Sequence, residues 1–288
     1  MISFRYHIVT ITAVFLALAL GFVLGAAIRP TEQAVKSNVD RLTGEVSEKR
    51  AQIVDLRNQL QQTNGVVKNL STRVVRGALI GRQVVYMDDG NAKSWQGRVR
   101  KAMSDATAKD VGTLTVTAKW MDPKSADDLN AIAAAGGIER GGDTGRAVIG
   151  ALGDRLGGPE GAELVSALAK GGFLKTDAKI EGAWPPQGAV VVTLTAGLPT
   201  AEPALMAAAF ARASAKVTPT LVVSGTAQDP GAVAALRDEA GGLPRLATFD
   251  SVGVDPAGAG SVLALSAAID GRGGDFGLAT GLPFLPPV

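Results

Sequence analysis

Five polar residues stand where they could support chemistry: Asp88, Asp89, Ser224, Thr226 and Asp250. Each lies at or just after the end of a short apolar run that is typical of a buried strand. In an open parallel sheet, ligands bind outside the carboxyl ends of the strands. Carboxylates placed there could bind a cation or act as general acids and bases. They could equally cap the next helix or face water, so the five residues form only a speculative pocket.

The chain offers few of the side chains that enzymes and metal sites use. It has no cysteine, and its one histidine is His7. Ser224 therefore has no histidine nearby that could activate it in a Ser-His triad. Copper and zinc prefer thiolate, thioether or imidazole ligands, and only methionines remain to supply them. A phosphate-binding GxxxxGK[ST] motif is also absent from the sequence. We expect neither catalysis nor a bound metal or cofactor.

Size and charge limit the classes of partner. The chain has 288 residues and a formal net charge of +2. No basic stripe interleaved with aromatic residues is present, so nucleic acid is not an expected partner. After an apolar head and a heptad region, the remaining length is enough for one sizeable α/β domain or two small ones.

The second part of the chain alternates between apolar runs and helical patterns. The expected strands are 83–87, 112–120, 189–194, 220–223 and 246–249. Helices are expected from Asn91 to about Ala108 and after three Asp-Pro pairs, because Asp as N-cap with Pro at the first position favours a helix start. Those pairs begin at Asp122, Asp229 and Asp255. This alternation predicts a parallel sheet covered on both faces, with a helical insertion near 137–170.

The head of the chain is apolar. Residues 8–28 carry no charge, and 21 residues match the length needed to cross a bilayer core. A cleaved signal peptide is the alternative, since Gly25-Ala26-Ala27 resembles a cleavage site. We favour an uncleaved anchor in the cytoplasmic membrane. The N-terminus is expected inside and the bulk of the chain outside, because a short N-terminus precedes a large trailing domain.

Small residues recur every fourth position within this span, at Ala13, Ala17, Gly21 and Gly25. They share one helix face, and small residues let two helix backbones approach closely in lipid. Glycine and alanine are also common in membrane helices generally. Pro30, which follows, could open a second helix or kink a continuous one.

A heptad repeat follows the span. Apolar residues recur every seven residues in two sets offset by four, which predicts a coiled coil. The predicted interface is Val35, Val39, Leu42, Val46, Ile53, Leu56, Leu60, Val67, Leu70 and Val74. β-Branched residues dominate the a positions and leucine the d positions, a pattern that favours a parallel dimer. The alternative is one long amphipathic helix that packs on its own domain.

Two polar residues, Lys49 and Thr63, interrupt the d positions and could either fix or loosen the register. Glu45 falls at g and Arg50 at the following e, which is the pairing that a parallel coil uses. The coil partner is therefore expected to be a second copy of the chain or a related coiled-coil protein.

Several stretches resemble one actinobacterial family, the MctB-type proteins, known as copper transporters and including the cell-division protein SteB. The similar stretches are Met1 to Arg5, Phe15 to Gly21, the heptads, the strand after Gly81-Arg82, Gly112 to Thr117 and Asp270 to Gly277. The resemblance implies a single-span protein with an outer coiled coil and a Rossmann-like domain. It carries over no metal ligand.

The expected organisation is therefore a stub and transmembrane anchor at 1–29, a parallel coiled coil at 30–76 and a Rossmann-like α/β domain at 77–288. The expected function is a non-enzymatic scaffold or regulator of cell division and cell-wall hydrolysis. Its partners would be envelope or division proteins such as a wall-hydrolase regulator. The alternatives are copper transport across the envelope and, less favoured, an enzyme that uses the Rossmann-like pocket.

Overall fold

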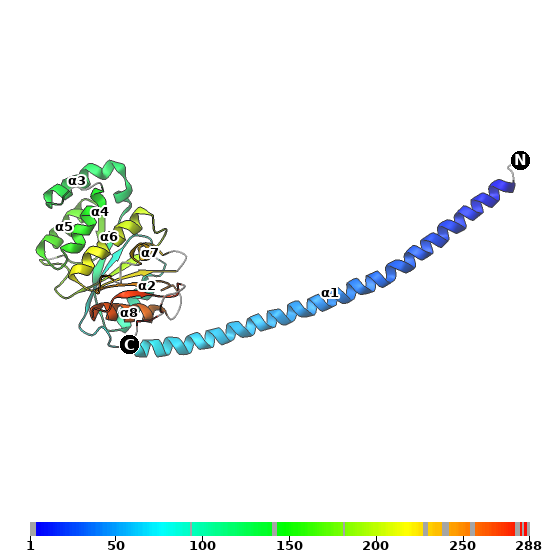
Figure 1. Cartoon of the computed structure of the whole chain (residues 1–288), viewed down its shortest axis with the longest axis horizontal. Coiled ribbons are helices and arrows are strands. Elements are labelled where there is room, and N and C mark those ends of the chain that lie inside the picture. The colour runs from blue at the N-terminus through cyan, green and yellow to red at the C-terminus, as the bar shows by residue number, and fades with distance from the viewer. Residues whose placement is uncertain are drawn as a thin grey trace. The chain divides into compact units, whose positions relative to one another are not determined.

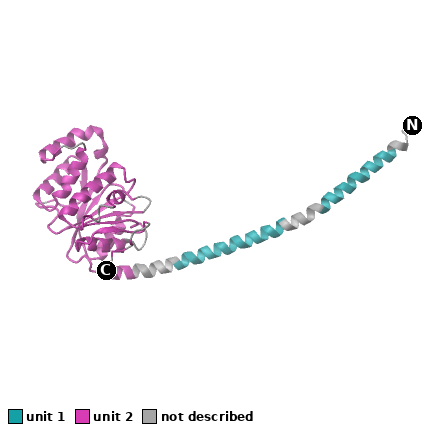
Figure 2. Cartoon of the chain, in the orientation of Figure 1, with its two compact units in different colours: residues 1–63 teal, residues 64–288 magenta. Residues whose placement is uncertain are grey.

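The computed structural model describes residues 4–92, 94–139, 143–180, 182–226, 230–237, 242–253, 257–279, 283 and 285–286. The side chains of residues 4–6, 27–34, 60–69 and 257 lie outside this description. The chain divides into two compact units, residues 1–63 and 64–288 (Figure 2). Pro30 and Thr63 belong to the stretches whose side chains are not described, as do the predicted interface residues Leu60 and Val67.

Helices and strands follow the long first helix in a mixed order, with α3, α4 and α5 in succession between β2 and β3 (Figure 1). The α-helices are α1 Phe4–Val75, α2 Gln96–Asp105, α3 Ala126–Ala135, α4 Thr144–Asp154, α5 Pro159–Lys170, α6 Glu202–Val217, α7 Ala232–Leu236 and α8 Ala257–Ile269. The strands are β1 Gln83–Asp88, β2 Lys109–Val116, β3 Leu174–Thr176, β4 Val190–Thr195, β5 Thr220–Ser224, β6 Leu246–Phe249 and β7 Gly274–Phe276. Two 3₁₀ helices, η1 Ala118–Met121 and η2 Pro123–Ser125, precede α3.

The strands form one seven-stranded sheet with the order β3-β2-β1-β4-β5-β6-β7. Every neighbouring pair is parallel except β2 with β3, which is antiparallel. The prediction of a mixed α/β domain built on a mostly parallel sheet is confirmed. From β1, the chain adds β2 and β3 on one side and then β4 to β7 on the other side. This change of direction places a topological switch point between the carboxyl ends of β1 and β4.

Both faces of the sheet are covered, as near-continuous apolar strands require. One face packs against α2 and α8, with Val99, Met103 and Leu265 in its core. The other face packs against helices of the α3 to α7 region, with Leu152, Leu168 and Phe210 in its core (Figure 1). Val75 at the end of α1 and Leu79 in the following loop are buried in the first core.

Some element bounds differ from the predicted ones. Asn91 does not cap α2, because this helix begins only at Gln96 and its N-cap position is Trp95. The Asn91 N–H group instead donates to the Asp89 carboxylate in a turn. The strand expected at 112–120 lies at Lys109–Val116, and Thr117 then caps η1 by accepting from the Lys119 N–H. Asp122 caps η2 as predicted. Asp229 and Asp255 lie outside the described residues.

Candidate functional site

The N-terminal part of α1 has the length and composition of a membrane span. Residues His7–Ala26 form a helical stretch of 20 mostly apolar residues, and their side chains are exposed. The segment fits a membrane anchor; a signal sequence would share these properties. The predicted packing face, formed by Ala13, Ala17, Gly21 and Gly25, lies within it. Apart from the adjacent backbone of the helix itself, no described atom lies within 4 Å of a Cβ placed on either glycine.

The predicted coiled-coil interface lies on the middle of α1. Between residues 35 and 59, the interface side chains Val35, Val39, Leu42, Val46, Ile53 and Leu56 are 48–57% exposed. Leu70 and Val74, further on, are also exposed. Whether this apolar stripe pairs with a second helix stays a prediction.

Asp88 and Asp89 lie at the carboxyl end of β1, beside the switch point, and both are buried. Asp88 accepts from the Gly90 N–H at 2.8 Å. Asp89 accepts from the Asn91 N–H at 2.9 Å and, through its other oxygen, from the Thr195 hydroxyl at 2.8 Å and the Ala196 N–H at 3.0 Å. The Asp89 carboxylate thus ties the end of β1 to the end of β4.

Burial raises the pKa of Asp89, because the surrounding protein disfavours its charged form. The hydrogen bonds from Asn91, Ala196 and Thr195 oppose this shift in pKa but do not cancel it. Thr195 in turn accepts from the Ala232 N–H at 2.9 Å, so the same network positions the start of α7. Three donors already occupy the Asp89 oxygens, which favours a structural role for this carboxylate.

Asp250 follows β6 and is fully buried. It pairs with Arg237 and accepts from the Ser251 hydroxyl at 2.8 Å. It also accepts from the N–H groups of Leu278 at 2.7 Å and Ala279 at 3.2 Å. Its carboxylate therefore holds the segment after β7, and both of its oxygens already accept hydrogen bonds.

The last two residues of the speculative pocket lie after β5. Ser224 is buried, and its hydroxyl has no hydrogen-bond partner among the described residues. Thr226 is exposed. The structure groups Asp88 and Asp89 with Thr195, and it groups Asp250 with Arg237 and the C-terminal segment. Of the five predicted residues, Asp89 lines one of the described cavities, and whether the five form one site stays a prediction.

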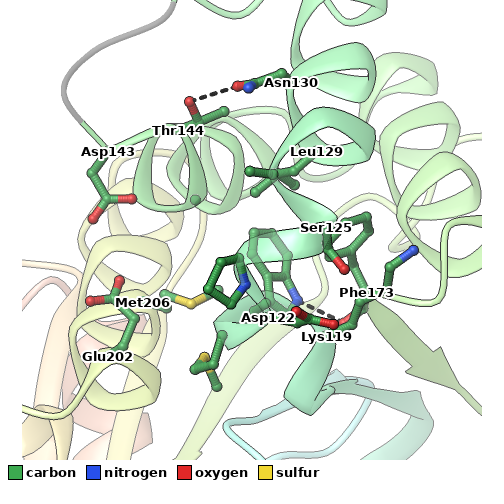
Figure 3. A pocket seen from close by; sticks show the side chains of 15 residues that line it. Lys119, Asp122, Ser125, Leu129, Asn130, Asp143, Thr144, Phe173, Glu202 and Met206 are labelled. Carbon is green, nitrogen blue, oxygen red and sulfur yellow. Dashed lines mark hydrogen bonds between the residues drawn. The ribbon is translucent and has the colours of Figure 1, made fainter.

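The sequence did not point to the cavity shown in Figure 3, which has a volume of about 330 Å³. It lies among η1, η2, α3 and the N-termini of α4 and α6. The charged and polar residues that line it are Lys119, Asp122, Ser125, Asn130, Asp143, Thr144 and Glu202. Trp120, Phe173 and Met206 supply apolar lining. A second cavity of about 390 Å³, beside Asp89, shares Met121 with the first.

The charged side chains around the first cavity already have partners. Lys119 binds Asp128 at 2.8 Å and lies over the Phe173 ring. Arg146 binds Asp143 at 2.6 Å and Glu202 at 3.2 Å, and so bridges the N-termini of α4 and α6. The Glu202 contact is the main reason that the pKa of Arg146 is raised. Asp143 also caps α4 by accepting from the Arg146 N–H at 3.1 Å.

Sequence reasoning missed this cavity because it missed α6. The only sequence signal was Glu202-Pro203 ahead of an alanine-rich run, a pattern that fits a helix start. Asp122 was expected to be a cap and is one, and Asp143 also caps a helix.

The described residues hold no cluster of three or more His, Asp or Glu side chains that could bind a metal ion. Met87, Met103 and Met206 are buried in the core, and Met121 is 42% exposed. A single exposed thioether is a poor site for copper(I), which prefers several sulfur ligands.

Comparison with known proteins relates the whole chain to one family. The family model described as "Copper transport outer membrane protein, MctB" matches residues 1–287. The chain is 26% identical over 310 aligned positions to the protein named "Copper transporter MctB" of Mycobacterium bovis, covering 94% of each. The same protein name, identity and coverage hold for Mycobacterium tuberculosis strains CDC 1551 and H37Rv. A match of this extent shows that the chain belongs to the MctB family.

Proposed function

We propose that this protein is a single-pass, membrane-anchored envelope protein that acts as a non-enzymatic scaffold. One observation carries the proposal: a single helix, α1, contains both a candidate membrane span and a heptad-spaced apolar stripe with exposed side chains. Such a stripe is stabilised when it packs against a second helix. The span anchors the protein, the stripe recruits its coiled-coil partner, and the α/β domain is the part presented to other envelope proteins.

The contacts of the α/β domain support a non-enzymatic role. Asp89 and Asp250 are held by several donors each, and Lys119, Asp143 and Glu202 form ion pairs. A general acid or base needs a polar atom that can reach the substrate. Among the described residues around the two cavities, the carboxylates and Lys119 instead stabilise turns and helix ends.

The proposed scaffold acts in cell division and cell-wall hydrolysis. This assignment rests on the resemblance to the family that includes SteB, and on an architecture suited to docking. The N-terminus lies inside and the α/β domain outside the cytoplasmic membrane. A wall-hydrolase regulator or another division protein is the kind of partner that this arrangement would dock.

Copper transport is the second candidate, because the three relatives bear that name. A transport role would need a path for the ion. The span at His7–Ala26 is lined by apolar and small residues, and a single helix of this kind gives an ion no polar route. We therefore favour the scaffold function over copper transport.

Deleting one heptad, Gln52 to Asn58, tests the two candidates together. The deletion keeps the a/d phase and shortens the helix by about 10 Å at 1.5 Å per residue. A scaffold that reaches its partner at a set distance should lose function in cell separation, while the coil still pairs. A four-residue deletion, which breaks the phase, should abolish pairing as well.

Cell separation and copper tolerance are measured in the same deletion strain. The scaffold predicts defective separation with normal copper tolerance. Normal separation with impaired copper tolerance would contradict the scaffold and support copper transport.

A further inference from the structure

The charges on α1 are unevenly distributed around the helix. With Val39, Val46 and Ile53 at a, the positions that flank the apolar stripe are e and g. Between residues 35 and 59, the e positions carry Lys36, Thr43, Arg50 and Arg57, and the g positions carry Asn38, Glu45, Gln52 and Gln59. The acidic residues Asp40, Glu48 and Asp55 occupy b and c, on the outer faces. The flanks of the stripe are therefore basic on one side and nearly neutral on the other.

Lys49 adds a further positive charge inside the stripe itself. It occupies a d position, where its neighbours along the stripe are Leu42 and Leu56. Its side chain is exposed, and its Nζ atom donates to the Gln52 side chain at 3.3 Å. In a parallel dimer, d residues face each other, so two copies of this chain would place two Lys49 ammonium groups in one layer. A buried polar residue in such a layer selects the partner.

Glu45 supplies little negative charge to balance Lys49 and the basic flank. It is the only acidic residue on the described flanks, and its carboxylate already binds Arg41 at 2.7 Å within the same helix. In a dimer of identical chains Arg50 could reach Glu45 of the second copy, but Arg57 would face the neutral Gln52. Identical chains would thus leave the Lys49 layer repulsive and the Arg57 flank without an opposite charge.

We propose that the intended partner of this stripe is a different, acidic helix. It is a parallel coiled-coil segment with a carboxylate opposite Lys49 and a second carboxylate at the g position that faces Arg57. Opposite charges at these positions favour the mixed dimer, and the Lys49 layer disfavours self-pairing. This inference rests on the proposed function, since it names the chemistry of the partner that the coil recruits.

The test uses the full-length protein in membranes and a variant of it as the acidic probe. The Lys49→Glu/Gln52→Glu variant places carboxylates opposite Lys49 and Arg57 of an unmodified copy. Ile53→Cys in both copies gives each a single cysteine, because the chain has none of its own. One copy carries a tag that changes its mobility, so that mixed and like disulfide dimers separate on a gel.

The matched control moves the same charge change to the outer face, as Ser37→Glu/Ala51→Glu/Asn58→Glu, all at position f. Random pairing of two copies gives mixed dimers as about half of the crosslinked material. With the seam variant, mixed dimers should rise to about nine-tenths, whereas the outer-face variant should stay near one half.

Mixed dimers near one half for both variants would overturn the acidic partner while leaving the coiled coil intact. Crosslinking that is absent from every mixture, the seam mixture included, would overturn the parallel coil of the proposed function and this inference with it. Weak self-crosslinking of the unmodified protein, together with strong mixed crosslinking, is the pattern that supports the proposal most directly.

Discussion

Gly277 and Asp250 form a contact that admits no side chain. Gly277 has a φ of +133°, and a Cβ atom placed on it would lie 2.3 Å from a carboxylate oxygen of Asp250. That carboxylate is fully buried and pairs with Arg237. Alanine at this position would strain the backbone and displace a buried ion pair.

We expect Gly277→Ala to lower the free energy of unfolding by about 3 kcal/mol or more. The measurement is urea unfolding of the full-length protein in detergent. Gly271→Ala is the control, because Gly271 also has a positive φ, +72°, but no atom of the described residues lies within 4 Å of its Cβ position. The control should lose only about 1 kcal/mol. Equal losses for both variants would show that the Asp250 contact is not the cause.

The buried carboxylate of Asp89 makes stability depend on pH. Its pKa is raised in the folded state, so the folded protein binds this proton more readily than the unfolded chain does. Its contribution to stability is therefore fully present below the unfolded pKa of 3.8 and is lost as the pH rises through the folded pKa. Asp89→Asn removes this titration together with one hydrogen-bond acceptor.

We expect the stability gap between the natural protein and Asp89→Asn to narrow as the pH rises from about 4. Unfolding free energies measured across that range test it. Thr195→Val should steepen the pH dependence, because the Thr195 hydroxyl is one of the donors that lowers the pKa. If the difference in unfolding free energy widened with rising pH, the three hydrogen bonds would lower the pKa of Asp89 by more than burial raises it.

At the scale of elements, α4 packs closely against α6. A Cβ atom on Gly153 would lie 2.6 Å from the Phe210 carbonyl oxygen and 2.8 Å from the Ala213 Cβ. Two helices approach this closely only when one side of the contact lacks a side chain. The alanines of α6 supply a similarly small surface on the other side.

Gly153→Ala should therefore force α4 away from α6 and destabilise the domain by about 2–3 kcal/mol. Gly150, in the same helix, has no described neighbour within 4 Å of its Cβ position apart from the adjacent helix backbone, and Gly150→Ala is the control. That control should instead stabilise the protein by about 0.5–1 kcal/mol, because alanine favours helix more than glycine does. Thermal unfolding of both variants tests this. Destabilisation of similar size in both would point to a helix that is sensitive at any position.

The sequence predicted the buried strands well, because runs such as Thr220–Val223 and Leu246–Phe249 consist of apolar residues and a single threonine each. It did not predict α6, whose alanines are buried around most of the helix and so show little amphipathic contrast. The three-residue strands β3 and β7 were also missed, since pairing with distant neighbours defines them. The sequence placed Asp89 and Asp250 at strand ends. It could not show that Thr195 and Arg237 bind these carboxylates, because the partners are distant in the sequence or lie on other elements.

At the scale of the whole molecule, the side chains available as metal ligands limit how tightly the protein can bind copper. Because the described residues lack a cluster of imidazole or carboxylate groups and bury three of the outer methionines, we expect untagged protein to bind copper no tighter than about micromolar. Competition titration with copper(I) and copper(II) measures this. A hexahistidine-tagged preparation serves as the positive control. A stoichiometric nanomolar site in the untagged protein would favour metal handling over the scaffold.

The buried end of α1 also has a mechanical consequence. Val75 and Leu79 lie in the core, and only residues 76–82 separate the helix from β1. A protein anchored by its first helix would feel any pull from a docked partner at this junction. The load would enter the sheet at β1, which has hydrogen-bonded neighbours, β2 and β4, on both sides. Tension would thus be shared by two strand pairings from the start, and an edge strand would not have to bear it alone.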